Sequence, residues 1–355
     1  MFHAMGRKAS VASEEMGRIG SVSPRLAEHL TLPLIAAPML RISGPELVIA
    51  ACRAGVIGAF PTANARSLDQ LDAWLGRITA ETGRAAAFAA NLIIRQPRMA
   101  EDLELLVRHR VPMVITSVGS PAPAIAPLRA VGTAVFADVR TIHHARRAAE
   151  AGADGLILLT AGAGGQTGWL NPFAFVSAVR EFFSGPVVLA GGVGDGRSLW
   201  AARTAGYDLA YAGTGFIAAT ESLAAERYRQ MLVDSSADDV VLTRAFTGLR
   251  SSILAPSVRA AGLDPDRLDE QISVADSARL YGDKAPEPGP RRWQDIWSAG
   301  HSVSGVREIA PAAQIVARFS AQYRQARAET ARLLGIADSA GPAGGSAAPD
   351  AGAAR

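Results

Sequence analysis

The chain has 355 residues, of which 49% are hydrophobic and 19% are charged, and its net charge is +3. This length supports the core of one barrel-sized domain or of two smaller domains. The cationic residues are scattered without a long basic run, so we expect no nucleic-acid partner. The single cysteine, Cys52, excludes an internal disulfide and a cysteine-based metal cluster, and we predict no metal site.

The two ends of the chain lack the periodicity of folded elements. Residues 1–22 mix Ser, Gly and charged residues and are predicted to form a mobile arm, and residues 337–355 are rich in Ala, Gly, Ser and Pro and are predicted to be disordered. No apolar run is long enough to span a bilayer, and none follows Arg7 and Lys8 as it would in a signal peptide. We therefore expect no membrane partner and a cytoplasmic protein.

Between these ends a helix–glycine–strand pattern recurs. Gly55, Gly132, Gly152 and Gly206 each follow a helical segment and precede a short apolar run, where a helix often ends in a residue with positive φ. Eight apolar runs are predicted as strands, at residues 34–38, 56–59, 87–92, 113–117, 134–138, 155–159, 186–190 and 209–212. Their continuous apolar character indicates burial on both faces, as in a parallel sheet.

Amphipathic segments between these strands predict helices, for example at residues 68–82, 99–109, 142–151 and 172–182. Eight βα units within about 190 residues predict a compact (β/α)8 TIM barrel, which we place at residues 23–220. A doubly wound open sheet is the alternative, but that fold does not need eight strands.

After the eighth strand the pattern changes. Residues 221–300 are interpreted as a mostly helical lid or substrate subdomain over the active face, with residues 236–243 among the helical segments and a Pro-rich linker at 282–292. Residues 301–336 are predicted to contain a C-terminal helix that returns to the barrel.

Ligands of such barrels bind where the strands end, in the βα loops. Here glycines cluster after the sixth, seventh and eighth strands. Loops after the seventh and eighth strands commonly bind phosphate, because glycine exposes backbone N–H groups and a helix N-terminus favours an anion. We therefore predict a phosphate site at Gly191, Gly192, Gly213 and Thr214; tight turns without a ligand are the alternative.

A phosphate site beside the broad glycine loop at 162–168 suggests a phosphorylated cofactor with a flat ring, which FMN would satisfy. Ala37, Pro38 and Met39, at the end of the first strand, could lie against the ring, and Asn91 could hydrogen-bond it or its ribityl chain. Asp138 ends the fifth strand and is a candidate polar contact; a helix N-cap or a structural partner for Arg140 is the alternative. The sequence contains no G-x-x-x-x-G-K-[ST], G-x-S-x-G or H-E-x-x-H motif for phosphate-loop, serine-hydrolase or zinc chemistry.

Several motifs in order resemble the nitronate monooxygenase family, FMN-dependent TIM-barrel oxidoreductases formerly called 2-nitropropane dioxygenases and related to bacterial FMN-dependent enoyl-ACP reductases. The resemblance covers residues 32–319 and includes A-A-P-M, the Asn91 segment, A-G-A-D-G-L-I-L, G-A-G-G-Q-T-G, L-A-G-G-V, D-L-A-Y-A-G-T-G-F and W-S-A-G. It implies FMN held at the ends of the first, third, sixth, seventh and eighth strands, where the candidate contacts are Ala37, Pro38, Met39, Asn91, Ala163, Gly164, Gly191, Gly192, Val193, Gly213 and Thr214. Asp138, at the end of the fifth strand, is a further candidate cofactor contact.

One departure from the family pattern bears on the chemistry. Family members usually carry histidine directly after the two glycines of the sixth loop, and here that position is Gln166. An amide cannot take a proton near neutral pH, although it can donate a hydrogen bond. His301, which follows W-S-A-G, is a second candidate catalytic contact, whereas His143 and His144 are interpreted as surface residues of a helix.

The expected function is therefore an FMN-dependent oxidoreductase that oxidises alkyl nitronates, small-molecule substrates, with O2. The alternatives are an NAD(P)H-dependent flavin reductase acting on quinone or enoyl-thioester acceptors, a flavin-binding protein inactive without the histidine, and a non-redox barrel that binds a phosphorylated metabolite. Isomerases and aldolases of that last class need a lysine or a carboxylate pair at strand ends, and only Asp138 is charged there. No feature of the sequence sets an oligomeric state.

Overall fold

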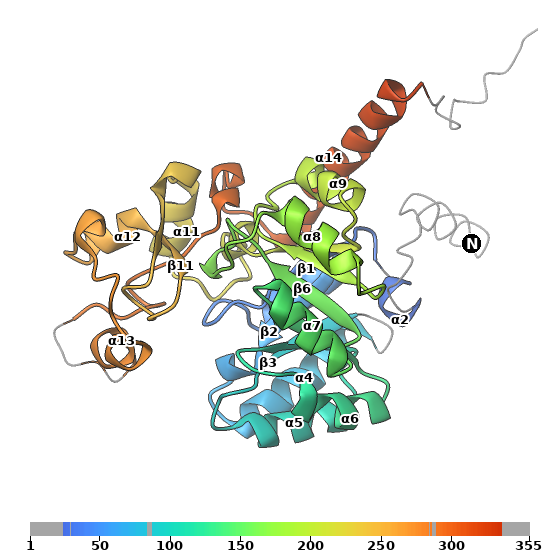
Figure 1. Cartoon of the computed structure of the whole chain (residues 1–355), viewed down its shortest axis with the longest axis horizontal. Coiled ribbons are helices and arrows are strands. Elements are labelled where there is room, and N and C mark those ends of the chain that lie inside the picture. Colours follow the sequence, from blue (N-terminus) through green and yellow to red (C-terminus); the bar gives the residue numbers. More distant parts are fainter. Residues whose placement is uncertain (1–23, 29, 84–86, 284, 286–288, 336–355) are drawn as a thin grey trace, which may run out of the picture.

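A closed barrel of eight parallel strands forms the centre of the protein (Figure 1). The computed structural model describes residues 24–28, 30–83, 87–283, 285 and 289–335, so the predicted arm at 1–22 and tail at 337–355 lie outside the described residues. The strands follow one another round the barrel in chain order and are β1 (Leu34–Ala36), β2 (Ile57–Pro61), β3 (Phe88–Ile93), β4 (Met113–Ser117), β5 (Ala134–Val139), β6 (Gly155–Leu159), β8 (Val187–Ala190) and β9 (Leu209–Ala212). The pairing of Leu34 with Ala210 closes the ring. The predicted TIM barrel and its eight strands are confirmed.

The outer helices form where capping residues and apolar spacing coincide. In α4 (Leu68–Thr82) the Ser67 side chain accepts a hydrogen bond from the Gln70 N–H, and Leu71, Leu75 and Ile78 turn one face toward the sheet. The other helices after the first seven strands are α3 (Pro45–Arg53), α5 (Met99–Arg108), α6 (Ala122–Ala130), α7 (Ile142–Glu150), α8 (Pro172–Arg180) and α9 (Gly196–Thr204). Short helices α2 (Pro24–Ala27) and η1 (Thr62–Asn64) complete this part of the chain.

The predicted glycine turns end four of the barrel helices. Gly55, Gly132, Gly152 and Gly206 have φ values of 89°, 79°, 94° and 104°. Glycine reaches this left-handed region without the steric penalty that other residues pay, so each helix stops and the chain enters the next strand.

The eighth helix of the barrel is α14 (Ala312–Leu333), which packs against α9 and α3 (Figure 1). Its buried face includes Ile315, Val316, Phe319 and Tyr323. The segment between the short helix α10 (Thr214–Ile217) and α14 is therefore inserted between the last strand of the barrel and the helix that completes its outer ring.

The insertion lies to one side of the barrel, in yellow and orange in Figure 1. It contains α11 (Glu226–Val233), η2 (Ala237–Asp239), β10 (Val240–Thr243), β11 (Ser251–Leu254), α12 (Ala255–Ala260), η3 (Pro265–Arg267), α13 (Val274–Tyr281) and η4 (His301–Gly305). A small core of its own includes Phe246, Ile253, Val258 and Ile296. A second cluster, with Ile42, Ile217, Tyr228, Leu232 and Trp297, joins the insertion to the barrel loops.

The helical interpretation of residues 236–243 is wrong. The segment forms η2 and then strand β10, which pairs antiparallel with β11; β11 in turn pairs with β7 (Gly165–Gln166), a piece of the predicted site loop. Val240, Val241 and Thr243 are β-branched and favour a strand once a partner is available, and that partner is supplied only by the folded chain.

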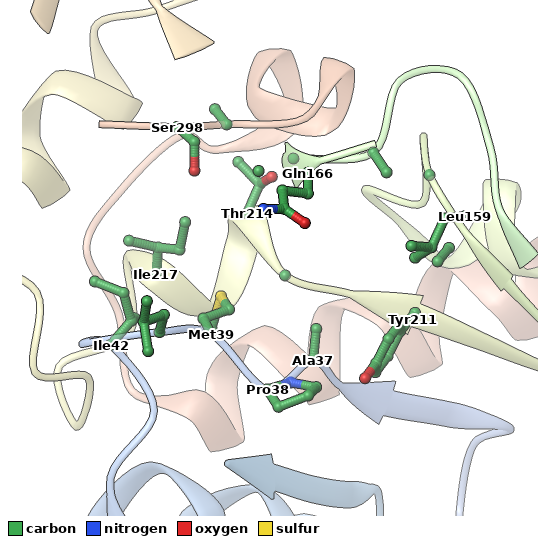
Figure 2. A pocket seen from close by; sticks show the side chains of 18 of the residues that line it. Ala37, Pro38, Met39, Ile42, Leu159, Gln166, Tyr211, Thr214, Ile217 and Ser298 are labelled. Carbon is green, nitrogen blue, oxygen red and sulfur yellow. The ribbon is translucent and has the colours of Figure 1, made fainter. Parts of the chain in front are cut away.

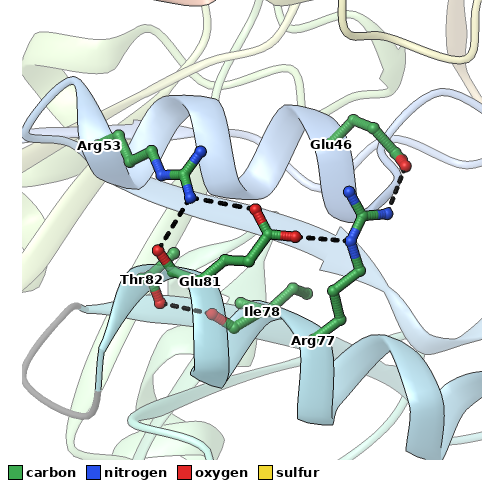
Figure 3. A network of polar contacts seen from close by, with 6 residues as sticks. All are labelled: Glu46, Arg53, Arg77, Ile78, Glu81 and Thr82. Carbon is green, nitrogen blue, oxygen red and sulfur yellow. Dashed lines mark hydrogen bonds and ion pairs between the residues drawn. The ribbon is translucent and has the colours of Figure 1, made fainter.

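Ion pairs on the outer surface join α3 to α4 (Figure 3). The Arg77 guanidinium donates to Glu46 at 2.6 Å and to Glu81 at 2.8 Å, and Arg53 donates to Glu81 at 3.1 Å. These side chains are exposed, and surface pairs of this kind contribute little to stability. Within the described part of the chain, no helix combines the length and apolar character needed to cross a membrane.

Candidate active site

The floor of the candidate site follows from the two-residue period of the strands. The barrel interior is filled by inward side chains that include Ile35, Ala89, Phe136, Ile157 and Leu209. Two positions further along each strand, the next inward residue lies at the carboxyl end of the barrel. These residues are Ala37, Asn91, Asp138, Leu159 and Tyr211, and all of them line one cavity.

This cavity has a volume of about 380 Å³ and lies between the barrel and the inserted segment. All of the predicted site residues except His301 line it: Ala37, Pro38, Met39, Asn91, Asp138, Ala163, Gly164, Gln166, Gly191, Gly192, Val193, Gly213 and Thr214. Figure 2 shows Ala37, Pro38 and Met39 on one side of the space and Gln166 and Ser298 on the other.

One end of the cavity is a glycine cradle formed by Gly191, Gly192, Val193 and Gly213. Gly191 and Gly192 have φ values of 138° and 74°. A Cβ on Gly191 would lie 2.4 Å from Thr160 Oγ1, so the chain path there requires glycine. Among the described residues, no hydrogen-bond acceptor pairs with the backbone N–H groups of these four cradle residues. Unpaired N–H groups in such turns form an anion site.

Thr214 and α10 refine the predicted phosphate site. The Thr214 hydroxyl accepts a hydrogen bond from the Gly300 N–H at 3.0 Å, and its own proton is left to donate. Because α10 has only four residues, it adds little helix dipole. The anion-binding capacity of this end therefore resides in individual backbone N–H groups.

The opposite part of the floor is built from polar side chains. The Asn91 amide donates to the Ile115 carbonyl at 3.0 Å and to Ser117 Oγ at 3.1 Å, which fixes its plane on the neighbouring strand β4. Asp138 Oδ1 and the Tyr211 hydroxyl are buried, yet neither has a hydrogen-bond partner in the described part of the chain. Burial raises the pKa of Asp138 to about 7 and the pKa of Tyr211 well above its ordinary value.

Tyr211 lies on strand β9 with its ring in the barrel interior, and the residue lines the cavity. Its hydroxyl is directed toward the segment of Ala37 and Pro38 and is enclosed by the protein (Figure 2). Buried polar groups are normally hydrogen-bonded, so the unpartnered Asp138 carboxyl at the cavity floor fits a ligand that carries polar groups.

The roof of the cavity is carried by Gln166, which belongs to strand β7. Gln166 is opposite Ser251 of β11 in the antiparallel ladder, and its side chain projects into the cavity (Figure 2). The amide makes no hydrogen bond to another described residue and can therefore donate to a substrate. Thr167 anchors the loop, since its hydroxyl donates to the Thr160 carbonyl at 2.9 Å.

The remaining wall is largely apolar and comes from the inserted segment. The rings of Tyr228 and Trp297 stack with their centroids 4.8 Å apart, and the Tyr228 hydroxyl donates to the Ser298 carbonyl. Trp293 and Leu249 extend this wall. Sequence reasoning missed these contacts, although W-S-A-G pointed to the Trp297 segment.

The structure also explains the glycine of W-S-A-G. A Cβ on Gly300 would lie 2.6 Å from the Gly162 carbonyl oxygen, and the His301 N–H donates to that oxygen at 3.0 Å. The two loops thus touch through their backbones. The His301 ring covers Gly162 and is not among the residues lining the cavity, which argues against the expected catalytic contact. His143 and His144 are exposed on α7.

Comparison with known proteins agrees with this architecture. The sequence matches the nitronate monooxygenase family over residues 100–321. The chain belongs to the nitronate monooxygenase family. It is 26% identical to a nitronate monooxygenase of Paraburkholderia phytofirmans, across 82% of this chain and 92% of that protein.

Two further relatives indicate the range of the family's neighbours. A (3aS,4S,5R,7aS)-5-hydroxy-7a-methyl-1-oxo-octahydro-1H-indene-4-carboxyl-CoA dehydrogenase of Mycobacterium tuberculosis is 28% identical over 62% of each chain. The crystal structure of a nitroalkane oxidase from Streptomyces ansochromogenes superposes with a TM-score of 0.71 at 27% identity, over 86% of this chain and 99% of that chain. This member of the nitronate monooxygenase family is thus an oxidoreductase of a flavin-dependent class.

Metal ligands are a separate question. In the parts of the chain that the structure describes, no three His, Cys, Asp or Glu side chains are grouped so that they could hold a metal ion. Cys52 lies on α3, and burial raises the pKa of its thiol to about 12.

Proposed function

We propose that this protein is an FMN-dependent oxidoreductase that oxidises alkyl nitronates with O2. The observation that carries the proposal is the combination, in one cavity, of a glycine cradle with unpaired N–H groups and a floor with unpartnered polar atoms. A phosphate at one end and a polar flat ring along the floor would satisfy both.

The residues present fit FMN in a definite arrangement. The N–H groups of Gly191, Gly192, Val193 and Gly213, with the Thr214 hydroxyl, would hold the phosphate. The ring would lie along Ala37, Pro38 and Met39, within reach of Asn91 and Asp138, and Ala163 and Gly164 would close the other side. When bound, the flavin would accept two electrons from the substrate and pass them to O2.

Gln166 limits which substrate the site can process. Its amide projects into the space opposite Ala37 and Pro38, where it can donate a hydrogen bond to a nitro oxygen. It cannot remove an α-proton from a neutral nitroalkane, and losing a general base typically costs about 10²–10⁴-fold in rate. A nitronate is already deprotonated, so the substrate that suits this residue is the anion.

Anaerobic stopped-flow spectroscopy tests the proposal. Propyl-2-nitronate should bleach the flavin absorbance of the purified protein, whereas the neutral nitroalkane should react far more slowly. Gln166→His should raise the nitroalkane rate by roughly 10²-fold and leave the nitronate rate within a few-fold, because only the neutral substrate needs a base. A protein that binds no FMN, or a flavin that nitronate does not reduce, would overturn the proposal.

A second candidate is an NAD(P)H-dependent flavin reductase that acts on quinone or enoyl-thioester acceptors. The apolar wall of Leu249, Trp293 and Trp297 supports a bulky acceptor, and one relative's name specifies a coenzyme A thioester. The same stopped-flow experiment separates the candidates, since this function requires bleaching by NADH or NADPH and reoxidation by the acceptor. Binding of a sugar phosphate without FMN would instead favour the non-redox barrel.

A further inference from the structure

Asp138 is the last inward-facing residue of β5 and is half-buried at the cavity floor. Four buried side-chain polar atoms among the described residues have no hydrogen-bond partner, and two of these are Asp138 Oδ1 and the Tyr211 hydroxyl. Both residues line the same cavity, from strands β5 and β9. The Tyr211 hydroxyl and Asp138 Oδ1 are enclosed by the protein, whereas Asp138 Oδ2 is not enclosed and has no hydrogen-bond partner among the described residues. An unpartnered carboxyl oxygen at the cavity floor indicates a ligand that supplies the missing hydrogen bond.

Among the described residues, no ion pair neutralises the Asp138 carboxylate. The other charged or titratable residues lining the cavity are Arg140, Tyr211 and Tyr228. No ion pair joins Arg140 to Asp138 within the described parts of the chain, and the Tyr228 hydroxyl donates to the Ser298 carbonyl. Two other polar side chains that line the cavity, Asn91 of β3 and Ser117 of β4, hydrogen-bond each other and are neutral.

These surroundings favour the uncharged acid. Removal from water alone raises the pKa of Asp138 to about 7, and a ligand laid over the floor would displace more water and raise it further. A neutral carboxyl is also a hydrogen-bond donor, whereas a carboxylate can only accept. The neutral acid thus provides a donor at the cavity floor without a positive charge.

We propose that Asp138 holds the flavin as a neutral carboxylic acid, which donates a hydrogen bond to it, so that cofactor binding takes up a proton at this side chain. The inference rests on the proposed flavin function and deepens it. The ring carbonyl oxygens and unprotonated ring nitrogens of a flavin are acceptors, which a neutral donor satisfies and an ionised carboxylate would repel.

The proton linkage has a definite sign. Well below pH 7 the Asp138 carboxyl of the free site is already protonated, so Asp138 adds no pH dependence to the affinity for flavin. Above pH 7 the free site ionises and binding must restore the proton, so the dissociation constant rises up to tenfold for each pH unit. The effect ends where the acid ionises in the complex as well.

The test removes FMN from the full-length protein and titrates it back by calorimetry at about pH 8, in two buffers of different ionisation enthalpy. We expect the uptake of close to one proton per flavin by the wild type and of none by Asp138→Asn. Binding of riboflavin, which lacks the phosphate, should be accompanied by the same proton uptake at the protein. Titration of the phosphate is then excluded as the cause of the uptake. Tyr211→Phe should keep the proton uptake, because the Tyr211 hydroxyl is enclosed by the protein and is not the group that takes up the proton.

A wild-type affinity that is independent of pH, or equal proton uptake by Asp138→Asn, would overturn the inference while leaving flavin binding intact. Protein that binds no flavin at any pH would instead overturn the proposed function itself. The wild-type pH series needs no variant, so the result does not depend on whether Asp138→Asn folds.

Discussion

The two ends of the cavity floor recognise ligands by different means. At the ends of β8 and β9, Gly191, Gly192 and Gly213 expose main-chain N–H groups. At the ends of β3 and β5, Asn91 and Asp138 present side chains. Backbone N–H groups do not titrate near neutral pH and change only if the chain path changes, whereas side chains can be altered one at a time. The glycine end is suited to a constant anionic group and the side-chain end to adjusting the chemistry.

The two ends also affect stability differently. The glycine end uses a chain path with positive φ that glycine adopts without strain. The side-chain end keeps a carboxyl and a phenol buried without partners, which destabilises the cofactor-free fold. We therefore expect variants at the side-chain end to change stability with pH, and variants at the glycine end to change cofactor affinity at every pH.

The largest expected effect is on the cofactor-free protein. We compare the free energy of unfolding of Asp138→Asn with that of the wild type at two pH values. The variant should gain on the order of 2–4 kcal/mol over the wild type between about pH 4 and about pH 8. In the unfolded wild type, Asp138 loses its proton near pH 4, whereas in the folded protein it keeps the proton until the pH reaches its raised pKa of about 7. Wild-type stability therefore falls as the pH rises between these values. Urea unfolding of both proteins across this range measures the change. If the free energies of unfolding of the two proteins changed equally with pH, Asp138 would ionise as readily in the folded as in the unfolded protein. The two ends of the cavity would then not differ in how their stability depends on pH.

A smaller effect is expected at the glycine end. Gly191→Ala places a methyl group 2.4 Å from Thr160 Oγ1, at a φ of 138°, and should weaken FMN binding about 10–100-fold at every pH. Fluorescence titration with FMN measures the affinity. Gly76→Ala, on α4, is the matched control, because the added Cβ would lie 4.0 Å from its nearest neighbour, Cε1 of His109. Equal affinities for the two variants would mean that the cradle does not hold the cofactor.

The smallest effect is expected away from both ends. Glu81→Gln removes the carboxylate that Arg53 and Arg77 share on the surface between α3 and α4 (Figure 3). Exposed pairs gain little over their hydrated state, so the melting temperature and the FMN affinity should both stay within experimental error. A clear loss of FMN affinity would show that the contrast between the cavity ends depends on the rigidity of the outer helices.

Much of the barrel could be predicted because its signals are local. Each strand is a short apolar run, and glycines such as Gly55 and Gly206 mark the helix ends by their backbone freedom. The cradle at Gly191 and Gly213 could be placed for the same reason, since parallel strands of a barrel bring their carboxyl ends together. Strand β10 could not be predicted, because Val240 and Val241 become a strand only when β11 lies beside them.

The roles of Gln166 and Tyr211 needed the folded chain. Gln166 could be singled out by its place in the loop, but its pairing with Ser251 joins residues far apart in sequence, and this pairing holds the amide over the floor. Tyr211 is predicted to be a core residue on a buried strand, and only its level in the barrel shows that it lines the cavity.

The sequence by itself thus determined the parallel barrel, the glycine turns and the positions of the strand ends, because these depend on hydrophobic period and backbone freedom within a few residues. The tertiary structure alone decided which polar groups lie buried without partners and which inserted segments, such as the one carrying Trp297, form the walls of the cavity. Burial and the pKa of Asp138 depend on what surrounds a side chain, and those surroundings come from strands and loops distant in the sequence.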